Sequence, residues 1–200
     1  MKVLVVLGHP RKGSFNHAIA DRCVSALKES GHIVFFHDLY EERFDPLITW
    51  DEIGSIDKAN ALTRKHCKEL EEAEGIIIIH PNWWGQPPAI LKGWIDKVFR
   101  AKVAYQFDAG DKGEGIPRGL LKARKAIVYN TSDTPPAREK KQFGDPLETT
   151  WKNCIFDFCG VKQFRRRTFS VIVTSTLEQR KAWLDEVSKD IGKEFPEGAI

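Results

Sequence analysis

Two uninterrupted apolar runs constrain the fold of this chain more than any other feature. Residues 3–7 read Val-Leu-Val-Val-Leu, and residues 76–79 are four consecutive isoleucines. A strand that is covered on both faces reads as a continuous apolar run, because neither face of it meets water. We therefore predict two central strands of a parallel sheet, over residues 2–8 and 75–79, with helices on both faces.

Helical and strand patterns alternate along the rest of the chain. Ser14 is a suitable N-cap for the first helix, and Thr176 begins a capping box for the last. In the helix after Pro87-Pro88 we expect Lys92, Asp96, Lys97 and Arg100 to form the solvent face. The remaining predicted strands cover residues 33–39, 125–130 and 161–173. The remaining predicted helices cover residues 56–73 and 145–159. Two long connections are expected, over residues 101–124 and 131–144. Five strands alternating with about five helices predict an α/β fold with a doubly wound sheet.

Composition narrows the class of protein further. The 200 residues, 42% hydrophobic and 30% charged, suit a single globular domain over residues 1–200. The net charge of +3 is too small to indicate binding to nucleic acid or to a membrane surface. We interpret Arg165-Arg166-Arg167 as a solvated face, and the less favoured alternative is a contact with phosphate or nucleic acid. Four cysteines without a Cys-x-x-Cys pair predict no disulfide framework and no metal site. We see no targeting segment and expect a cytoplasmic protein.

Ligands of open α/β sheets bind beyond the carboxyl ends of the strands. Three predicted loops lie there, at residues 9–16, 81–88 and 131–136. We therefore expect the functional site to be built from these three segments.

The first loop leads into a helix N-terminus at Ser14. Free backbone N–H groups and the positive end of the helix dipole favour an anion there, and Arg11 or Lys12 would add charge. Ser14 stands where a nucleotide P-loop needs its lysine, and Gly-x-Gly-x-x-Gly is absent, so nucleoside triphosphate and dinucleotide sites are disfavoured. A metal-free phosphate site and a helix merely capped by Ser14 are the two alternatives.

The other two loops add aromatic and polar groups. Trp83 and Trp84 are adjacent in a loop that prolines make rigid, and Gly85 leaves room beside their rings. This arrangement favours binding of a planar aromatic ligand. The alternative is that one of the two indoles simply covers the hydrophobic core. Thr131 and the residues after it are rich in hydrogen-bonding groups, although alone they would suggest an ordinary turn. A phosphate, a flat ring and a polar edge together describe a flavin mononucleotide (FMN) group.

Two sequence blocks carry a resemblance to a known family. Gly8-His9 is followed by Ser14-Phe15-Asn16, and Pro81-x-x-Trp84 leads into Pro-Ala-Ile-Leu-Lys-Gly-Trp-Ile-Asp-Lys-Val-Phe at 88–99. In these blocks the chain resembles the flavodoxin-like NAD(P)H:quinone oxidoreductases, which include general-stress quinone reductases and ancillary subunits of potassium-efflux systems. The resemblance implies a three-layer fold with five parallel strands in the order 2-1-3-4-5, bound FMN or FAD, and a homodimer with sites near the subunit interface.

The resemblance also implies roles for individual residues. The flavin would be bound by three segments, comprising His9, Ser14, Phe15 and Asn16; Pro81, Asn82, Trp83, Trp84 and Gly85; and Thr131, Ser132, Asp133 and Thr134. Tyr105 and Phe107 look like the aromatic segment that covers the substrate pocket of the other subunit. The resemblance implies neither a catalytic nucleophile nor a metal.

The chain departs from the family pattern in the third loop. Asp133-Thr134 stands where well-studied members have Gly-Gly, and Phe143 falls where they place a histidine. No tyrosine lies between Thr131 and Gly144. A carboxylate at Asp133 would disfavour negative charge on a reduced flavin, unless it is hydrogen-bonded outward.

The expected function is flavin-dependent transfer of a hydride from NAD(P)H to a quinone or similar small acceptor, by a ping-pong mechanism. FMN is favoured slightly over FAD because no adenine pocket can be read from the sequence. The alternative is a flavin-binding regulatory subunit of a potassium-efflux-type transporter, with that membrane protein as its partner. A one-electron carrier is disfavoured by the net charge of +3, since such carriers usually present an acidic face.

Overall fold

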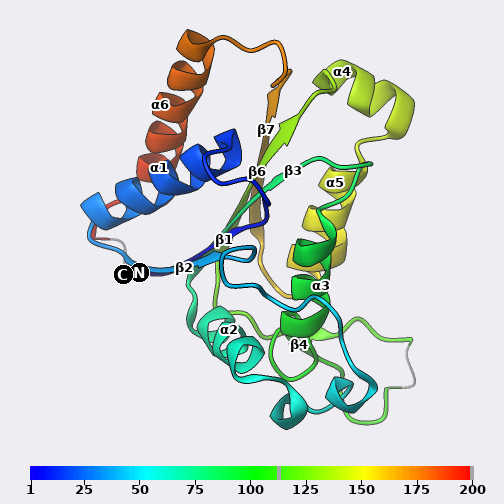
Figure 1. Ribbon diagram of the computed structural model, residues 1–200. Helices are drawn as coiled ribbons and strands as arrows, with labels where there is room; N and C mark the ends of the chain where they lie inside the picture. Colours follow the sequence, from blue (N-terminus) through cyan, green and yellow to red (C-terminus); the bar gives the residue numbers. More distant parts are fainter. Residues whose placement is uncertain (112–113, 199–200) are drawn as a thin grey trace.

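A parallel sheet forms the middle layer of the protein (Figure 1), seen in a computed structural model that describes residues 1–111 and 114–198. The sheet has five strands in the order β2-β1-β3-β6-β7. Its strands are β1 (Lys2–Leu7), β2 (Ile33–Asp38), β3 (Gly75–Pro81), β6 (Lys125–Ser132) and β7 (Gln163–Ser170). Counted within this sheet alone, the order is 2-1-3-4-5, so the predicted strand order is confirmed.

Helices cover both faces of the sheet, which explains its apolar strands. Alternate side chains of β1 enter two different cores: Val5 packs with α1 (Phe15–Glu29) and α6 (Leu177–Glu194), whereas Val6 packs toward α2 (Ala61–Glu72) and α3 (Ala89–Val98). Figure 1 shows α1 and α6 together on one side, with α3 and α5 (Pro146–Thr149) on the other. A strand between two such layers must be apolar at every position.

The connections contain short elements. The long connection 101–124 carries a two-stranded antiparallel hairpin of β4 (Tyr105–Gln106) and β5 (Arg118–Gly119). The other short elements are η1 (Trp50–Glu52), η2 (Ile56–Lys58), α4 (Pro136–Arg138), η3 (Glu139–Phe143) and η4 (Thr150–Asp157). None of the helices in the described ranges is long and apolar enough to cross a membrane.

Several predicted boundaries were wrong, including that of the last strand, which was expected over 161–173 and covers Gln163–Ser170. The helix expected over 56–73 begins at Ala61, because the Asn60 side chain caps it by accepting a 2.8 Å hydrogen bond from the Thr63 N–H. The loop expected over 131–144 begins later, because Thr131 and Ser132 continue β6 alongside β7. That segment is also helical over α4 and η3 rather than irregular.

Lys97 is buried, contrary to its predicted place on the solvent face. Its ammonium lies 3.2 Å from the Glu52 carboxylate and donates a 2.9 Å hydrogen bond to the Leu47 carbonyl. The segment that carries these partners folds over α3 at Gly93, where an added Cβ would lie 2.3 Å from the Pro46 carbonyl oxygen. Helical periodicity could not reveal this burial, because the covering segment is distant in sequence.

The arginine run of β7 is ion-paired rather than simply solvated. Arg165 and Arg167 point to α6, and Arg166 points to the opposite side of the sheet, as alternation along a strand requires. The acidic partners are Asp190 and Glu194 for Arg165, Asp145 and Glu148 for Arg166, and Glu186 and Asp190 for Arg167.

Candidate functional site

The three predicted loops meet in one cleft of about 400 Å³ at the carboxyl edge of the sheet. That volume lies within the usual range for small-molecule sites. Its lining residues are His9, Arg11, Gly13, Ser14, Phe15 and Asn16 after β1; Pro81, Asn82 and Trp83 at the end of β3; Thr131, Ser132, Asp133 and Thr134 at the end of β6; and Ile172 and Arg180. Of the predicted flavin residues, all line this cleft except Trp84 and Gly85.

The N-terminus of α1 forms one end of the cleft. Ser14 is its N-cap, with an extended backbone and a side chain that accepts from the His17 N–H. Gly13 has φ +70°, a left-handed conformation that lets the chain turn sharply into the helix. The first N–H groups of a helix have no intrahelical acceptor, and the basic residues Arg11 and Arg180 are part of the lining of the same cleft. This end of the cleft is therefore suited to an anion.

Asn16 connects the first loop to β6. Its side-chain N–H donates a 2.9 Å hydrogen bond to the hydroxyl of Thr131, although the residue is only 3% exposed. The Oδ1 atom of Asn16 is buried and accepts no hydrogen bond within the described structure. Buried acceptors are normally satisfied, so an orphaned one in a cleft indicates a missing donor from a ligand.

The end of β3 separates the two tryptophans. Trp83 lines the cleft, and its indole centroid lies 6.3 Å from the His9 ring. Trp84 has φ +56° and is fully exposed, so its ring points away from the core and the cleft. Asn82 holds this turn by accepting a 3.0 Å hydrogen bond from the Gly85 N–H.

Trp84 and Gly85 instead line a neighbouring hollow of about 340 Å³. Asn82 and Thr134 border both this hollow and the main cleft, so the two are adjacent. Phe143, which stands where the family pattern places a histidine, also lines the hollow. An apolar ring therefore occupies a position at which an ionisable side chain was expected.

Asp133 lines the cleft and is hydrogen-bonded to a neighbouring segment. Its carboxylate accepts a 2.8 Å hydrogen bond from the N–H of Val173, in the segment that follows β7. This hydrogen bond partly compensates the negative charge of Asp133, for which a conflict with negative charge on a reduced flavin was expected.

Tyr105 and Phe107 do not line the cleft of their own chain. Their rings lie 5.9 Å apart edge to face, and Tyr105 borders a separate hollow of about 670 Å³ that also includes Ile48 and Ile53. β4 lies beyond the carboxyl end of α3, toward the amino edge of the sheet (Figure 1). Any contribution of these rings to a cleft would have to come from a second copy of the chain.

Arg180 and Ile172 were missed by the sequence analysis. Both lie after β7, and Arg180 donates a 2.8 Å hydrogen bond to the Ile172 carbonyl. The carboxyl-edge rule that selected the other three loops would also have selected the segment after the fifth strand.

His80 lies beneath the cleft as a neutral, fully buried imidazole. Its Nε2 accepts hydrogen bonds of 2.9 Å from both Trp151 and Asn130, and its Nδ1 lies 2.8 Å from the Pro81 carbonyl. Because an indole N–H can only donate, the ring proton is on Nδ1. Burial lowers the pKa of His80 to about 4, so the ring supports the end of β3 rather than exchanging protons near neutral pH.

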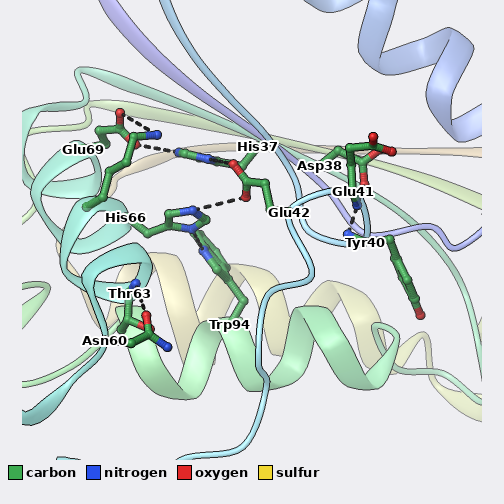
Figure 2. Close-up of polar contacts among 11 residues, drawn as sticks. His37, Asp38, Tyr40, Glu41, Glu42, Asn60, Thr63, His66, Glu69 and Trp94 are labelled. Carbon is green, nitrogen blue, oxygen red and sulfur yellow. Dashed lines mark hydrogen bonds and ion pairs between the residues drawn. The ribbon is translucent and has the colours of Figure 1, made fainter.

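A cluster that contains two histidines, His37 and His66, lies at α2 (Figure 2). His37 is held between two carboxylates, at 2.8 Å from Glu42 and 2.7 Å from Glu69. His66 lies 3.2 Å from Glu42, and its Nδ1 accepts a 2.8 Å hydrogen bond from the Trp94 indole. Burial raises the pKa of Glu42, but the two imidazoles outweigh this and lower it to about 2.

His37, Glu42 and His66 are side chains of the kind that bind metal ions, but their geometry favours hydrogen bonds between them over metal binding. The Trp94 N–H places the ring proton of a neutral His66 on Nε2, the atom that faces Glu42, so that atom has no free lone pair. The His37 and His66 rings also overlap at 3.7 Å, so their in-plane lone pairs cannot converge on one ion. We interpret the cluster as a hydrogen-bonded ion-pair network that joins β2, α2 and α3.

Comparison with known proteins agrees with this architecture. The parallel strand order 2-1-3-4-5, with a cleft at the carboxyl edge of the sheet, is that of a flavodoxin-like fold. A family model described as a flavodoxin-like fold matches residues 1–193. An uncharacterized NAD(P)H oxidoreductase of Haemophilus influenzae is 31% identical over 191 residues, 92% of this chain and 91% of that protein. The chain belongs to this flavodoxin-like family of NAD(P)H oxidoreductases.

Two further matches extend the comparison. The FMN-dependent NADH:quinone oxidoreductase of Pelagibacter ubique is 28% identical over 173 residues, 82% of this chain and 86% of that protein. The crystal structure of Smu.1420 from Streptococcus mutans superposes with a TM-score of 0.83 at 29% identity, covering 96% of this chain and all of that one. The chain spans between about half and two thirds of several longer curated relatives.

Proposed function

We propose that this protein is an FMN-dependent oxidoreductase that passes a hydride from NAD(P)H to a quinone or similar small acceptor. The observation that carries the proposal is the single cleft in which the α1 N-terminus, Trp83 and the polar end of β6 converge. Relatives named as NAD(P)H oxidoreductase and as FMN-dependent NADH:quinone oxidoreductase support the same activity.

The residues of the cleft fit the three parts of FMN. The α1 N-terminus at Ser14 would hold the phosphate, with Arg11 and Arg180 supplying positive charge. The orphaned Oδ1 of Asn16 would accept a hydrogen bond from a hydroxyl of the ribityl chain. Trp83 and the residues after Thr131 would contact the ring system. The cleft has one helix N-terminus for one phosphate, which favours FMN over FAD.

The bound flavin would supply the hydride chemistry, accepting the hydride from NAD(P)H and passing it to the second substrate. The protein would position the ring and limit its contact with water. Asp133 is turned toward Val173, so it adds no unpaired carboxylate at the ring. No side chain of the cleft has to act as a nucleophile.

The neighbouring hollow is the proposed acceptor site. It shares Asn82 and Thr134 with the cleft, and Trp84, Phe143 and Pro146 give it an apolar lining suited to a flat ring. In a homodimer, Tyr105 and Phe107 of one subunit would cover the site of the other.

Steady-state kinetics test this function. In the absence of oxygen, the FMN-loaded protein should oxidise more NADH or NADPH than its bound FMN can accept only when a quinone is present, with parallel double-reciprocal lines typical of a ping-pong reaction. A regulatory flavoprotein would bind FMN but show no turnover above that of free FMN, and this result would contradict the proposal.

A further inference from the structure

Behind the phosphate end of the cleft, Ser14, His17 and Asp38 form a chain of hydrogen bonds. The Ser14 hydroxyl lies 2.9 Å from Nδ1 of His17, and Nε2 of His17 lies 3.1 Å from the Asp38 carboxylate. The side chains of His17 and Asp38 are 16% and 13% exposed. Asp38 is itself fixed, because its other oxygen accepts the N–H groups of Tyr40 and Glu41 at 3.1 and 3.2 Å.

The protonation state of His17 decides what Ser14 can do. When His17 is neutral and donates to Asp38 from Nε2, its Nδ1 accepts the Ser14 proton, so the hydroxyl cannot donate to a ligand. When His17 is charged, Nδ1 donates to the Ser14 oxygen. The hydroxyl proton is then free to point into the cleft, where an anion would accept it.

The charges around His17 are mixed. The Asp38 carboxylate on β2 lies 3.1 Å from Nε2 of His17, and the His9 ring, 6.1 Å away on the loop after β1, lines the cleft. Arg11 donates its backbone N–H to His9, at 3.1 Å, and adds positive charge to the same loop. Lys12 is paired with Glu41 at 2.6 Å. An anion in the cleft would therefore be the main new negative charge near His17 on the side away from Asp38.

A ligand at this end is indicated independently of the helix N-terminus. Asn16 lines the cleft, is 97% buried, and has the unpartnered Oδ1 described above. Ser14 and Asn16 lie on the same first turn of α1, so a phosphate ester at Ser14 would bring its organic part toward Asn16.

We propose that binding of a phosphate monoester at Ser14 is coupled to uptake of a proton by His17, with Asp38 as the fixed counter-charge. His17 is thus a positioning residue that switches the Ser14 hydroxyl from donating inward to donating to the ligand. The inference rests on the proposed function only in taking FMN as the ligand.

Calorimetry of FMN binding to the flavin-free protein tests the coupling. Titrations at one pH slightly above neutral, in two buffers with different enthalpies of ionisation, should show net proton uptake for the wild type. His17→Gln and Asp38→Asn should lose most of that uptake, whereas Asp21→Asn, an exposed carboxylate on the same helix, should retain it. Riboflavin, which lacks the phosphate, should bind without the uptake.

The outcomes separate this proposal from the function. FMN binding without proton uptake, or with equal uptake in His17→Gln, would overturn the coupling and leave the oxidoreductase intact. If no flavin binds, the proposed function fails, and NMR of the wild-type His17 ring with inorganic phosphate still decides the coupling. Phosphate should move the titration midpoint of that ring to higher pH, and an unchanged midpoint would refute the coupling. The NMR measurement also serves if a variant does not fold.

Discussion

The side-chain amide of Asn16 donates a 2.9 Å hydrogen bond to the hydroxyl of Thr131, across 115 residues of sequence. This bond joins the first turn of α1 to the end of β6, and both segments line the cleft. It also orients the side chain of Asn16, whose Oδ1 is buried and accepts no hydrogen bond within the described structure.

Thr131→Val should destabilise the protein and weaken FMN binding. The substitution keeps the shape of the side chain but leaves the Asn16 N–H buried without an acceptor, which costs about 1–3 kcal/mol. Urea denaturation should show this loss in the free energy of unfolding. Thr63→Val is the matched control, because the Thr63 hydroxyl is buried without a partner and its removal should be neutral or stabilising. Equal effects of the two variants would contradict this account of Thr131.

The two adjacent tryptophans should respond differently to substitution. Trp83→Ala should weaken FMN binding about tenfold or more, since stacking of a base on an aromatic ring is worth roughly 1–3 kcal/mol. Trp84→Ala should leave FMN affinity nearly unchanged and raise the KM for the quinone, because Trp84 lines only the neighbouring hollow. Fluorescence titration with FMN and quinone kinetics measure the two effects. A greater loss of FMN affinity in Trp84→Ala would show that Trp84 swings into the cleft.

The buried His80 should make stability depend on pH. Its pKa is lowered from 6.5 to about 4 in the folded protein, so between these values the unfolded chain binds a proton that the folded chain does not. Stability should therefore fall as pH decreases from 6.5 to about 4. His80→Gln, which keeps an acceptor for Trp151, should be less stable at neutral pH but show a shallower pH dependence in this window. Identical slopes in urea denaturation would show that His80 titrates normally.

Glu42 should contribute to stability in a lower pH window. Its pKa is lowered from 4.5 to about 2 in the folded protein, so its contribution is complete above pH 4.5 and disappears toward pH 2. Glu42→Gln should thus be less stable than the wild type near neutral pH, and the difference should shrink as the solution is acidified through this range. A difference that stays constant with pH would mean that the lost interaction does not depend on the carboxylate charge.

Much of the architecture could be predicted because it depends on local patterns. Continuous apolar runs identify strands covered on both faces, and the carboxyl-edge rule then brings His9, Trp83 and Ser132 into one cleft although they are distant in sequence. The phosphate, flat-ring and polar-edge features of these loops indicated FMN, and the resemblance to the family agreed with that expectation.

The errors arose where contacts distant in sequence override local pattern. Lys97 has the periodicity of a solvent-facing residue but is covered by the segment around Leu47. Trp84 lines the neighbouring hollow, with a left-handed backbone that its sequence neighbours do not signal, and its role toward a flavin stays a prediction. Thr131 belongs to a strand because β7 pairs with it, although it resembles the start of a turn.

Anaerobic mixing of the FMN-loaded protein with NADH or NADPH, without any acceptor, tests the central claim most directly. The account predicts that the visible absorption of the oxidised flavin is lost in a single rapid phase, and that it returns when a quinone is added. A flavin absorption that persists through prolonged incubation with both nucleotides would contradict the proposal that this protein is an NAD(P)H oxidoreductase.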